Sequence, residues 1–544
     1  MRGIGAKGAI GIGLAIVLAI GVIGSWMVLR SGGDEKQAIV VGVTDTPDAL
    51  DPAYSYVAGS WDLYSNVYQG LLTLSNASDQ PVLDAAEVCE FTDNAQQVYR
   101  CTLREGLTFS SGRPVTPEDV QFSLERTQAM AQRAADEAED DSIPEDEKFT
   151  YSGPVSLLAS LEAVRVEGKD IIFELSEPDV TFPFVLAGGA GSIVDREVYE
   201  LLEPREDGEV VGSGPYLLTD FAFPDEDTPG YAELEPNPEY QGAVQVSDYP
   251  ITLRYYPGPE ALQEAWESGE IEVNGGQMAP AELSAINPHD PALRYSETTG
   301  STIRMLVNSG PSPSPASDET VRQSIAALLD RSALARQVHR HTVEPAYSLI
   351  PVGFTGHGTP YYDRYAGVDP DEVRSELTEA GHAVPVELRV GYGVGGGNAE
   401  EAAFVKEMLE ADGLFEIELQ EFPGVGGALA ASAEGTLDSF FVGWRPDFSD
   451  ADTYTAPLLT EDSVLAHGFS DPRIDRLISE TRSQVQRGST MDDFREIHEI
   501  AADAAVVIPL WQNRNIMVSD REITGLPYLR DAGGIFRLWE LARL

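Results

Sequence analysis

The chain has 544 residues, too many for one hydrophobic core, and we expect two or more domains. It carries 90 acidic and 36 basic residues, a formal net charge of −54, so most of its surface repels polyanions and nucleic-acid binding is not expected. The acidic residues are spread along the chain and predict a soluble, solvated surface. A denser acidic patch at residues 135–148 is interpreted as a charged surface insertion.

An apolar run at residues 8–29 follows Arg2 and Lys7 near the N-terminus. It is long enough to cross a bilayer as a helix, which takes about 20 residues, and neither an A-x-A-like cleavage site nor a lipid-attachment cysteine closes it. The positive charges before the run predict a cytoplasmic N-terminus and an extracellular main body. We therefore expect residues 1–37 to form an uncleaved membrane anchor and linker, with a cleaved signal peptide as the alternative.

The two cysteines, Cys89 and Cys101, stand in the stretch VCEFTDNAQQVYRC. Apolar alternation on both sides of the turn residues 92–94 predicts a hairpin with the cysteines opposite each other. Outside the cell such a pair is expected to be oxidised, and a disulfide across so short a loop contributes about 2–4 kcal/mol. Two unrelated buried thiols are the alternative, and two cysteines alone make a poor metal site.

Predicted strands and helices alternate along the chain from residue 38 onward. The sequences TPED at 116–119 and DPDE at 369–372 each combine a helix cap, a proline in the first turn and acidic residues, which predicts helix starts. Interleaved strands and helices predict α/β layers. Strands are expected at residues 38–43, 171–175, 251–256 and 302–308.

The run GYGVGGG at residues 391–397 contains G-x-G-x-x-G between a predicted strand and a predicted helix. Asn398 is the better helix cap, with Glu401 as its capping-box partner, which leaves Gly396 in the loop. Glu400 and Glu401 would then repel a phosphate at the helix N-terminus. We interpret the run as a flexible loop, with a dinucleotide site as the alternative.

Motifs of hydrolytic enzymes are absent from the sequence, which has neither G-x-S-x-G nor H-E-x-x-H. His339 and His341 lie close together, but no third ligand follows at a suitable spacing, so both are expected to be solvated loop residues. We therefore predict no catalytic residue, no metal site and no cofactor, and we do not expect an enzyme.

Several motifs follow one another in the order found in a known family. VGVTDTPDALDPAYSYVAGSWDLYSNVYQGLLTL at 41–74 contains a strand, an L-D-P turn and a helix, and YRCTLREGLTFSSGRPVTPEDVQFSLER at 99–126, VGSGPY at 211–216 and EAWESGEIEV at 264–273 come next. FFVGWRPDFSDADTY at 440–454 contains G-W-x-x-D. Over residues 38–527 the chain resembles the extracellular solute-binding proteins of family 5, the oligopeptide, dipeptide and nickel receptors of ABC importers.

This resemblance implies a two-lobed α/β fold of the periplasmic-binding-protein type (type II, with an extra subdomain) behind the N-terminal transmembrane helix. Crossing strands join the lobes in such proteins, which close over a ligand held in the cleft. The implied first lobe comprises residues 38–58, 190–303 and 510–544, with the extra subdomain at 59–189 and the second lobe at 304–509.

The resemblance also implies where the ligand binds. In peptide-binding members, the acid of G-W-x-x-D holds the terminal ammonium of the peptide, and the backbone just before it pairs with the peptide as an added strand. That acid falls on Asp447, with a role as a loop cap as the alternative; Trp444 could equally be a packing residue. The other ligand-binding residues implied are Gly443, Trp444, Arg445, Tyr56 and Ala58.

The function implied is that of a monomeric, membrane-tethered extracellular receptor that captures peptides and delivers them to an ABC importer permease. An oligosaccharide, a metal chelate or an opine-like compound is the alternative ligand. From other classes, a secreted enzyme or a receptor that only signals is the alternative function. Residues 450–452, Asp-Ala-Asp, depart from the D-P step of the family and leave the loop geometry beside Asp447 open.

Overall fold

The computed structural model describes residues 36–75, 78–224, 228–308, 314–395, 397–461, 463–465 and 467–544. The apolar run at residues 8–29, which the sequence predicts to be a membrane anchor, lies outside these residues. Within the described ranges, every helix is too short or too polar to cross a membrane.

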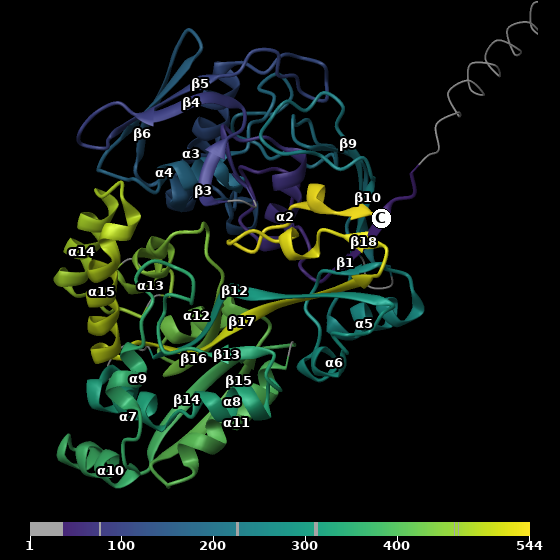
Figure 1. Cartoon of the computed structure of the whole chain (residues 1–544). Coiled ribbons are helices and arrows are strands. Elements are labelled where there is room, and N and C mark those ends of the chain that lie inside the picture. Colours follow the sequence, from purple (N-terminus) through teal and green to yellow (C-terminus); the bar gives the residue numbers. More distant parts are fainter. Residues whose placement is uncertain are drawn as a thin grey trace, which may run out of the picture.

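Within the described residues, an 11-stranded sheet runs through the molecule and connects an upper and a lower lobe (Figure 1). Its central strands, β12 (Leu293–Asn308) and β17 (Val507–Asp520), form a long antiparallel pair. The sequence predicted only residues 302–308 of β12, because the preceding residues are mostly polar, but they still pair along β17. The pairing shifts register between Thr299 and Ile303, so the strand pair is irregular where it passes between the lobes.

The other strands of this sheet continue into both lobes from the central pair. On the side of the second lobe, β12 pairs with β16; on the side of the first lobe, β17 pairs with β11. In order the strands are β15 (Phe415–Phe422), β14 (Val386–Gly393), β16 (Ser439–Trp444), β12, β17, β11 (Val273–Asn274), β1 (Ile39–Val43), β10 (Ile251–Tyr255), β9 (Gly230–Pro236) and β8 (Tyr216–Ala222), with β13 (Val343–Pro345) also paired to β17.

The C-terminal part of the chain returns to the first lobe and covers α2 (Ala58–Val67). The Asn66 amide donates to the Phe536 carbonyl at 3.0 Å, and the Leu538 N–H donates to the Asn66 side-chain oxygen at 3.1 Å. Phe536 and Trp539 pack in the same core as the buried strand β1. The start and the end of the described chain therefore share one hydrophobic core, the core of the first lobe.

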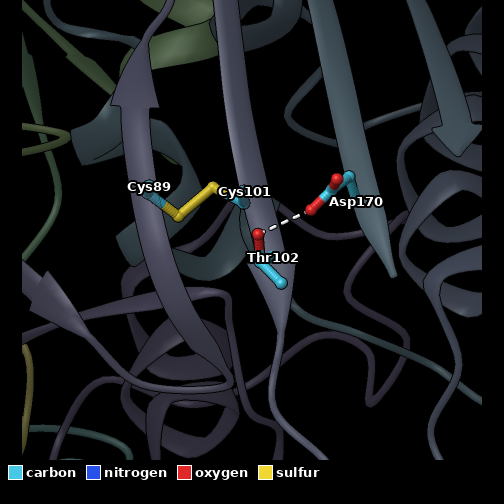
Figure 2. The surroundings of a disulfide bond; sticks show 4 residues. All are labelled: Cys89, Cys101, Thr102 and Asp170. Atoms are coloured by element: carbon cyan, nitrogen blue, oxygen red, sulfur yellow. Dashed lines mark hydrogen bonds between the residues drawn. A yellow bond between two sulfur atoms is a disulfide. The ribbon is translucent and has the colours of Figure 1, made fainter. Parts of the chain in front are cut away.

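A separate antiparallel sheet lies above the first lobe, in the order β4 (Ala86–Phe91), β5 (Val98–Leu103), β7 (Asp170–Leu175) and β6 (Leu161–Glu167). Cys89 and Cys101 face each other on β4 and β5 and form a disulfide, which confirms the predicted pairing (Figure 2). On the next strand, Asp170 accepts a hydrogen bond from the Thr102 hydroxyl at 2.6 Å. The hairpin thus carries a covalent link across its two strands.

The predicted helix starts are both confirmed. At α3 (Pro117–Glu139), the Asp119 carboxylate accepts from the Thr116 N–H at 2.8 Å. At α10 (Pro370–Glu379), the Asp369 carboxylate caps the helix by accepting from the Asp371 N–H at 2.9 Å.

The second lobe packs helices on both faces of its part of the sheet, so that two hydrophobic cores lie around β14, β16 and β12. This is the α/β layering predicted from the sequence. The remaining elements are β2 (Leu72–Ser75), β3 (Ser78–Leu83), α4 (Phe182–Ala187), α5 (Pro259–Ser268), α6 (Pro280–Ala285), α7 (Glu319–Leu328), α8 (Arg331–Gln337), α9 (Pro360–Tyr365), α11 (Asn398–Glu410), α12 (Val425–Ala433), α13 (Ala456–Leu459), α14 (Pro472–Arg482), α15 (Met491–Ala504), β18 (Ile523–Thr524) and β19 (Ala542–Arg543).

The glycine-rich run ends differently from the prediction. Gly397, with φ of 80°, is the N-cap of α11, so the prediction of Asn398 as the cap is wrong. Glycine adopts this left-handed conformation at little cost. The Asn398 side chain instead accepts from Arg304 at 3.0 Å, and the buried Glu401 carboxylate binds Arg304 at 2.7 Å.

The prediction that His339 is a solvated loop residue is also wrong. Its Nε2 lies 2.9 Å from Glu401 Oε2, and the residue is buried. His341 is exposed, as predicted. The start of α11 is therefore occupied by a satisfied internal ion-pair cluster, which supports the interpretation of the glycine run as a structural loop.

Candidate functional site

The segment that follows β16 crosses from the second lobe to the first. The Arg445 side chain donates to backbone carbonyls of the C-terminal segment, and Asp447 accepts a hydrogen bond from the Tyr56 hydroxyl, which lies just before α2. The Phe448 ring stacks on Phe184 of α4, with ring centroids 5.7 Å apart. Residues 445–448 therefore contact three different parts of the first lobe.

The Asp447 carboxylate is the most unusual group of this segment. Its two oxygens accept from hydroxyls, Oδ1 from Tyr56 and Oδ2 from Thr453 at 3.2 Å. Among the described residues no cation lies beside it, and burial raises its pKa to about 6, while the bonds from Tyr56 and Thr453 lower it. An oriented carboxylate between two lobes, without a positive partner from the protein, is suited to bind a cation.

Buried groups hold Tyr56 in place across from Asp447. Asp51 of the L-D-P turn accepts from Arg126 Nη2 at 2.6 Å, and both side chains are fully buried. The Tyr56 ring packs against Trp61, with centroids 5.4 Å apart. The turn and the helix that follows it thus fix the position from which the Tyr56 hydroxyl donates.

Two ion pairs fix the loop after Asp447. Asp450 accepts from Arg487 at 2.7 Å and 2.6 Å, and Asp452 accepts from Arg482 at 3.1 Å and 2.9 Å. Bidentate pairs of this kind restrain both position and orientation. Where the family has its D-P step, this chain has Asp450, Ala451 and Asp452, and arginines bind both carboxylates.

The remaining residues of the predicted site have different surroundings. Trp444 donates its indole N–H to the Thr453 carbonyl at 2.8 Å, so the ring is fixed next to the residue that contacts Asp447. Gly443 is exposed, and a Cβ there would meet nothing within 4 Å. Ala58 is the half-buried first residue of α2, where its methyl group can contribute only to shape.

Sequence reasoning missed three contributors to this region: Thr453, Phe448 and Asp62. Thr453 lies within the matched motif, and its hydroxyl was a detectable signal. Phe448 and Asp62 gave no such signal, because their partners Phe184 and Arg445 are remote in the sequence.

Two cavities adjoin the segment. One, of about 50 Å³, is lined by Asp447 and Phe448 together with aromatic residues of the first lobe that include Trp61 and Phe184. The other, of about 260 Å³, is lined by residues of both lobes, among them Thr299, Ser301, Phe354, Ser449, Asp450 and Arg487. Drug-sized ligands occupy pockets of about 300–1,000 Å³, so a larger ligand requires the lobes to separate.

A two-lobed α/β body with an oriented carboxylate between its lobes has the architecture of a binding protein that closes on a small ligand. Residues 80–464 match the family described as bacterial extracellular solute-binding proteins, family 5 Middle. The chain therefore belongs to the bacterial extracellular solute-binding proteins of family 5, the family that its motifs resemble. Proteins of this family are receptors for solutes, and we assign the chain no catalytic role.

Known relatives match over nearly the whole chain. The dipeptide-binding protein DppE of Bacillus subtilis is 21% identical over 550 residues, which cover 95% of this chain and 96% of DppE. The periplasmic oligopeptide-binding protein OppA of Haemophilus influenzae is 22% identical over 534 residues, 92% of this chain and 93% of OppA.

Solved structures share the fold. DppA from Helicobacter pylori, in complex with the peptide STSA, superimposes with a TM-score of 0.77 at 17% identity, over 94% of this chain and 99% of DppA. NikA from Staphylococcus aureus, in complex with Ni(L-His)2, gives a TM-score of 0.72 at 14% identity, over 93% of this chain and 100% of NikA. The two-lobed periplasmic-binding-protein fold is thereby shown for this chain.

Proposed function

We propose that the chain is the substrate-binding protein of an ABC importer and that it captures peptides between its lobes for delivery to a permease. The observation that carries this proposal is the Asp447 carboxylate, which accepts from the hydroxyls of Tyr56 and Thr453 and has no cationic partner within the part of the chain that the structure describes. The terminal ammonium of a peptide would supply the missing positive charge. The relatives named as dipeptide-binding and oligopeptide-binding proteins support the same ligand class.

The backbone before Asp447 offers a place for the peptide main chain. Strand β14 pairs with β16 only at Ser439 and Phe440, so the pairing ends well before Gly443. A peptide could add to this edge as a short strand, with its ammonium at Asp447 and its backbone along residues 441–444. Gly443 would then line the main chain, while Tyr56 and Ala58 form the opposite wall.

The larger cavity provides room for one side chain of the peptide. Its charged lining residues, Asp450 and Arg487, are paired with each other and carry no net charge together. Thr299, Ser301 and Phe354 add hydroxyl and aromatic surface. This lining supports a preference for peptides whose side chain in the larger cavity is uncharged.

The first test identifies the ligand by mass spectrometry of small molecules released when the purified protein is denatured. Peptides are expected. Release of oligosaccharides, metal chelates or opine-like compounds would replace the peptide assignment with that class, and finding no solute that raises the melting temperature would favour a receptor that only signals.

The second test addresses the role of Asp447 with two forms of one peptide, with a free and with an acetylated amine. Asp447→Ala should weaken binding of the free-amine peptide about 10-fold to 100-fold, as expected for a hydrogen bond to a charged group, and should change binding of the acetylated peptide little. Equal losses for both peptides would contradict the ammonium role.

We further propose the lobe boundaries predicted from the sequence, and that the chain acts as a monomer tethered outside the cell by residues 8–29. The separate hydrophobic cores and the β12–β17 pair between them support the division into two lobes. Membrane fractionation of the full chain and of a chain lacking residues 1–35 tests the tether. Recovery of both the full and the shortened chain in the soluble fraction would contradict the tether. So would a purified full-length protein whose first residue lies after residue 29, because the apolar run would then have been cleaved off.

A further inference from the structure

Arg445 is the residue of the predicted site whose contacts point away from a ligand. Its Nε donates to the Gly533 carbonyl at 3.0 Å, and its Nη2 donates to the Gly534 carbonyl. Nη2 also lies 3.5 Å from the Asp62 carboxylate. Arg445 thus leaves the end of β16 in the second lobe and binds groups that all belong to the first lobe.

The groups that receive Arg445 are fixed by the first lobe itself. We call them the Arg445 seat: the Gly533 and Gly534 carbonyls with the carboxylates of Asp62 and Asp45, the last 3.8 Å from Nη1. The Asp62 oxygen that faces Arg445 Nη2, Oδ1, also accepts from the Phe536 N–H at 3.0 Å, which holds the carboxylate in place within the first lobe.

A second arginine, Arg530, supports the same turn from within the first lobe. It donates to the Gly534 carbonyl and, at 2.8 Å, to the Gly275 carbonyl, and its guanidinium lies 4.0 Å from the centre of the Phe536 ring. These contacts hold the turn from within the first lobe. A preformed acceptor site costs little ordering entropy when its partner arrives.

The electrostatics of the seat favour an arginine. Asp62 is buried, one of its carboxylate oxygens has no hydrogen-bond partner among the described residues, and Arg530 lies 3.9 Å from that oxygen. Burial raises the pKa of Asp62 to about 6, and the charges of Arg445 and Arg530 lower it. When Arg445 leaves, the buried carboxylate loses part of its compensation, which disfavours separation of the lobes.

We propose that Arg445 is a positioning residue that latches the second lobe onto the first and so holds Asp447 opposite Tyr56, and that it is not a ligand contact. Closure of a two-lobed protein is an equilibrium between open and closed forms, and a contact made only in the closed form shifts that equilibrium. The planar guanidinium donates to two carbonyls through a rigid fork of N–H groups, a geometry that the lysine ammonium lacks.

The test measures closure directly, in the full chain in detergent micelles, by electron spin resonance distances between two spin labels. Glu162→Cys on β6 and Glu496→Cys on α15 place the labels at exposed positions, one on each lobe, while the native cysteines remain in their disulfide. Arg445→Ala should lower the ratio of short to long distances about tenfold or more, since it removes hydrogen bonds from a charged group. For Arg445→Lys, the ratio of short to long distances should lie between the ratios of wild type and Arg445→Ala.

Asp62→Asn identifies the seat, because asparagine can still accept from the Phe536 N–H but carries no charge. In the wild-type background, Asp62→Asn should shift the distances toward the open form. In the Arg445→Ala background, the same substitution should shift them much less, because its partner is already absent. Arg364→Ala is the matched control: Arg364 pairs with Asp503 on the surface of the second lobe and should leave the distances unchanged.

Identical distance distributions for wild type and Arg445→Ala, both with native melting temperatures, would overturn the latch. If Arg445→Ala lowers the melting temperature, the distance distributions of Asp62→Asn and Arg445→Lys test the latch instead. Unchanged distances in both of these variants would also overturn the latch. Because the distances are recorded without any ligand, this result is independent of the peptide assignment. The assignment is judged separately by the loss of free-amine peptide binding in Asp447→Ala.

Discussion

Two carboxylates in the second lobe, Glu401 and Asp447, lie beside the two motifs that drew attention in the sequence. Glu401 follows the glycine run and is surrounded by donors: Arg304 at 2.7 Å, His339 at 2.9 Å and the Trp511 indole N–H at 2.6 Å. Asp447 ends the sequence GWRPD and is held by two hydroxyls. One carboxylate is compensated by the fold and the other is not.

The pKa values of the two groups express this difference. Burial raises the pKa of Glu401, but the charges of Arg304 and His339 outweigh it and hold the pKa at about 2. For Asp447, burial dominates and the pKa rises to about 6. A carboxylate that stabilises the fold is fully satisfied by its neighbours, whereas a carboxylate kept for a ligand is oriented but lacks its counter-charge.

The largest expected effect is on stability. Glu401→Gln leaves the half-buried Arg304 without its counter-charge and should lower the free energy of unfolding by about 3–5 kcal/mol, measured by urea denaturation. Asp447→Asn, the matched variant, should leave the free energy of unfolding unchanged or higher, because burial disfavours its charged form. A similar loss in both variants would remove the distinction between the two carboxylates.

The pH dependence of stability sharpens the same contrast. The pKa of Glu401 is lower in the folded chain than its ordinary value of 4.5, so its contribution is present above pH 4.5 and is lost as the pH falls toward 2. The difference in unfolding free energy between wild type and Glu401→Gln should therefore shrink over that window. A difference that stays constant from pH 5 to pH 2.5 would contradict the assignment.

The next effect is on binding. A peptide ammonium needs the ionised form of Asp447, so protons compete with the peptide below pH 6, and affinity should fall by up to about tenfold for each further pH unit. Titration calorimetry from pH 7.5 to pH 4.5 measures this, with the acetylated peptide as the control. Equal pH dependence for both peptides would exclude Asp447 as the titrating group.

Features that depend on neighbours in the sequence were predictable. The two helix starts and the cysteine hairpin are formed by groups at most 12 residues apart, and the structure confirms them. The exception is the start of α11, where Asn398 has the side chain of a cap but Gly397 adopts the left-handed conformation and takes that place. The Asn398 side chain accepts a hydrogen bond from Arg304 there, and does not cap the helix.

Features that depend on distant partners were not predictable from spacing. Glu401 and His339 are brought together by packing of α8 and α11, and Arg445 meets groups that stand before and after it in the chain, Asp62 and Gly533. The pattern of apolar and polar residues in the sequence does not predict contacts between such distant residues. The family resemblance located the segment at residues 443–447, but only the geometry distinguishes Arg445, which binds protein groups, from Asp447.

A smaller effect is expected from Tyr56→Phe, which removes the hydroxyl that donates to Asp447. That hydrogen bond lowers the pKa of Asp447, so the midpoint of the pH profile for free-amine peptides should move to higher pH. At pH 8, where Asp447 is ionised in both proteins, affinity should rise about twofold to tenfold, because the peptide no longer displaces a hydrogen bond. A lower affinity at pH 8 would show that the Tyr56 hydroxyl itself binds the ligand, in addition to the ring that forms the opposite wall.

The smallest effect is expected from Trp444→Phe. The indole N–H holds the Thr453 carbonyl, and the Thr453 hydroxyl in turn donates to Asp447. Loss of one hydrogen bond should cost about 1 kcal/mol of stability and weaken binding of free-amine peptides by less than about tenfold, with acetylated peptides less affected. Trp266→Phe on α5 controls for the change in ring size. If Trp444→Phe weakens both peptides equally, Trp444 acts as a wall of the cleft and not through Thr453, and the uncompensated carboxylate alone accounts for ammonium recognition.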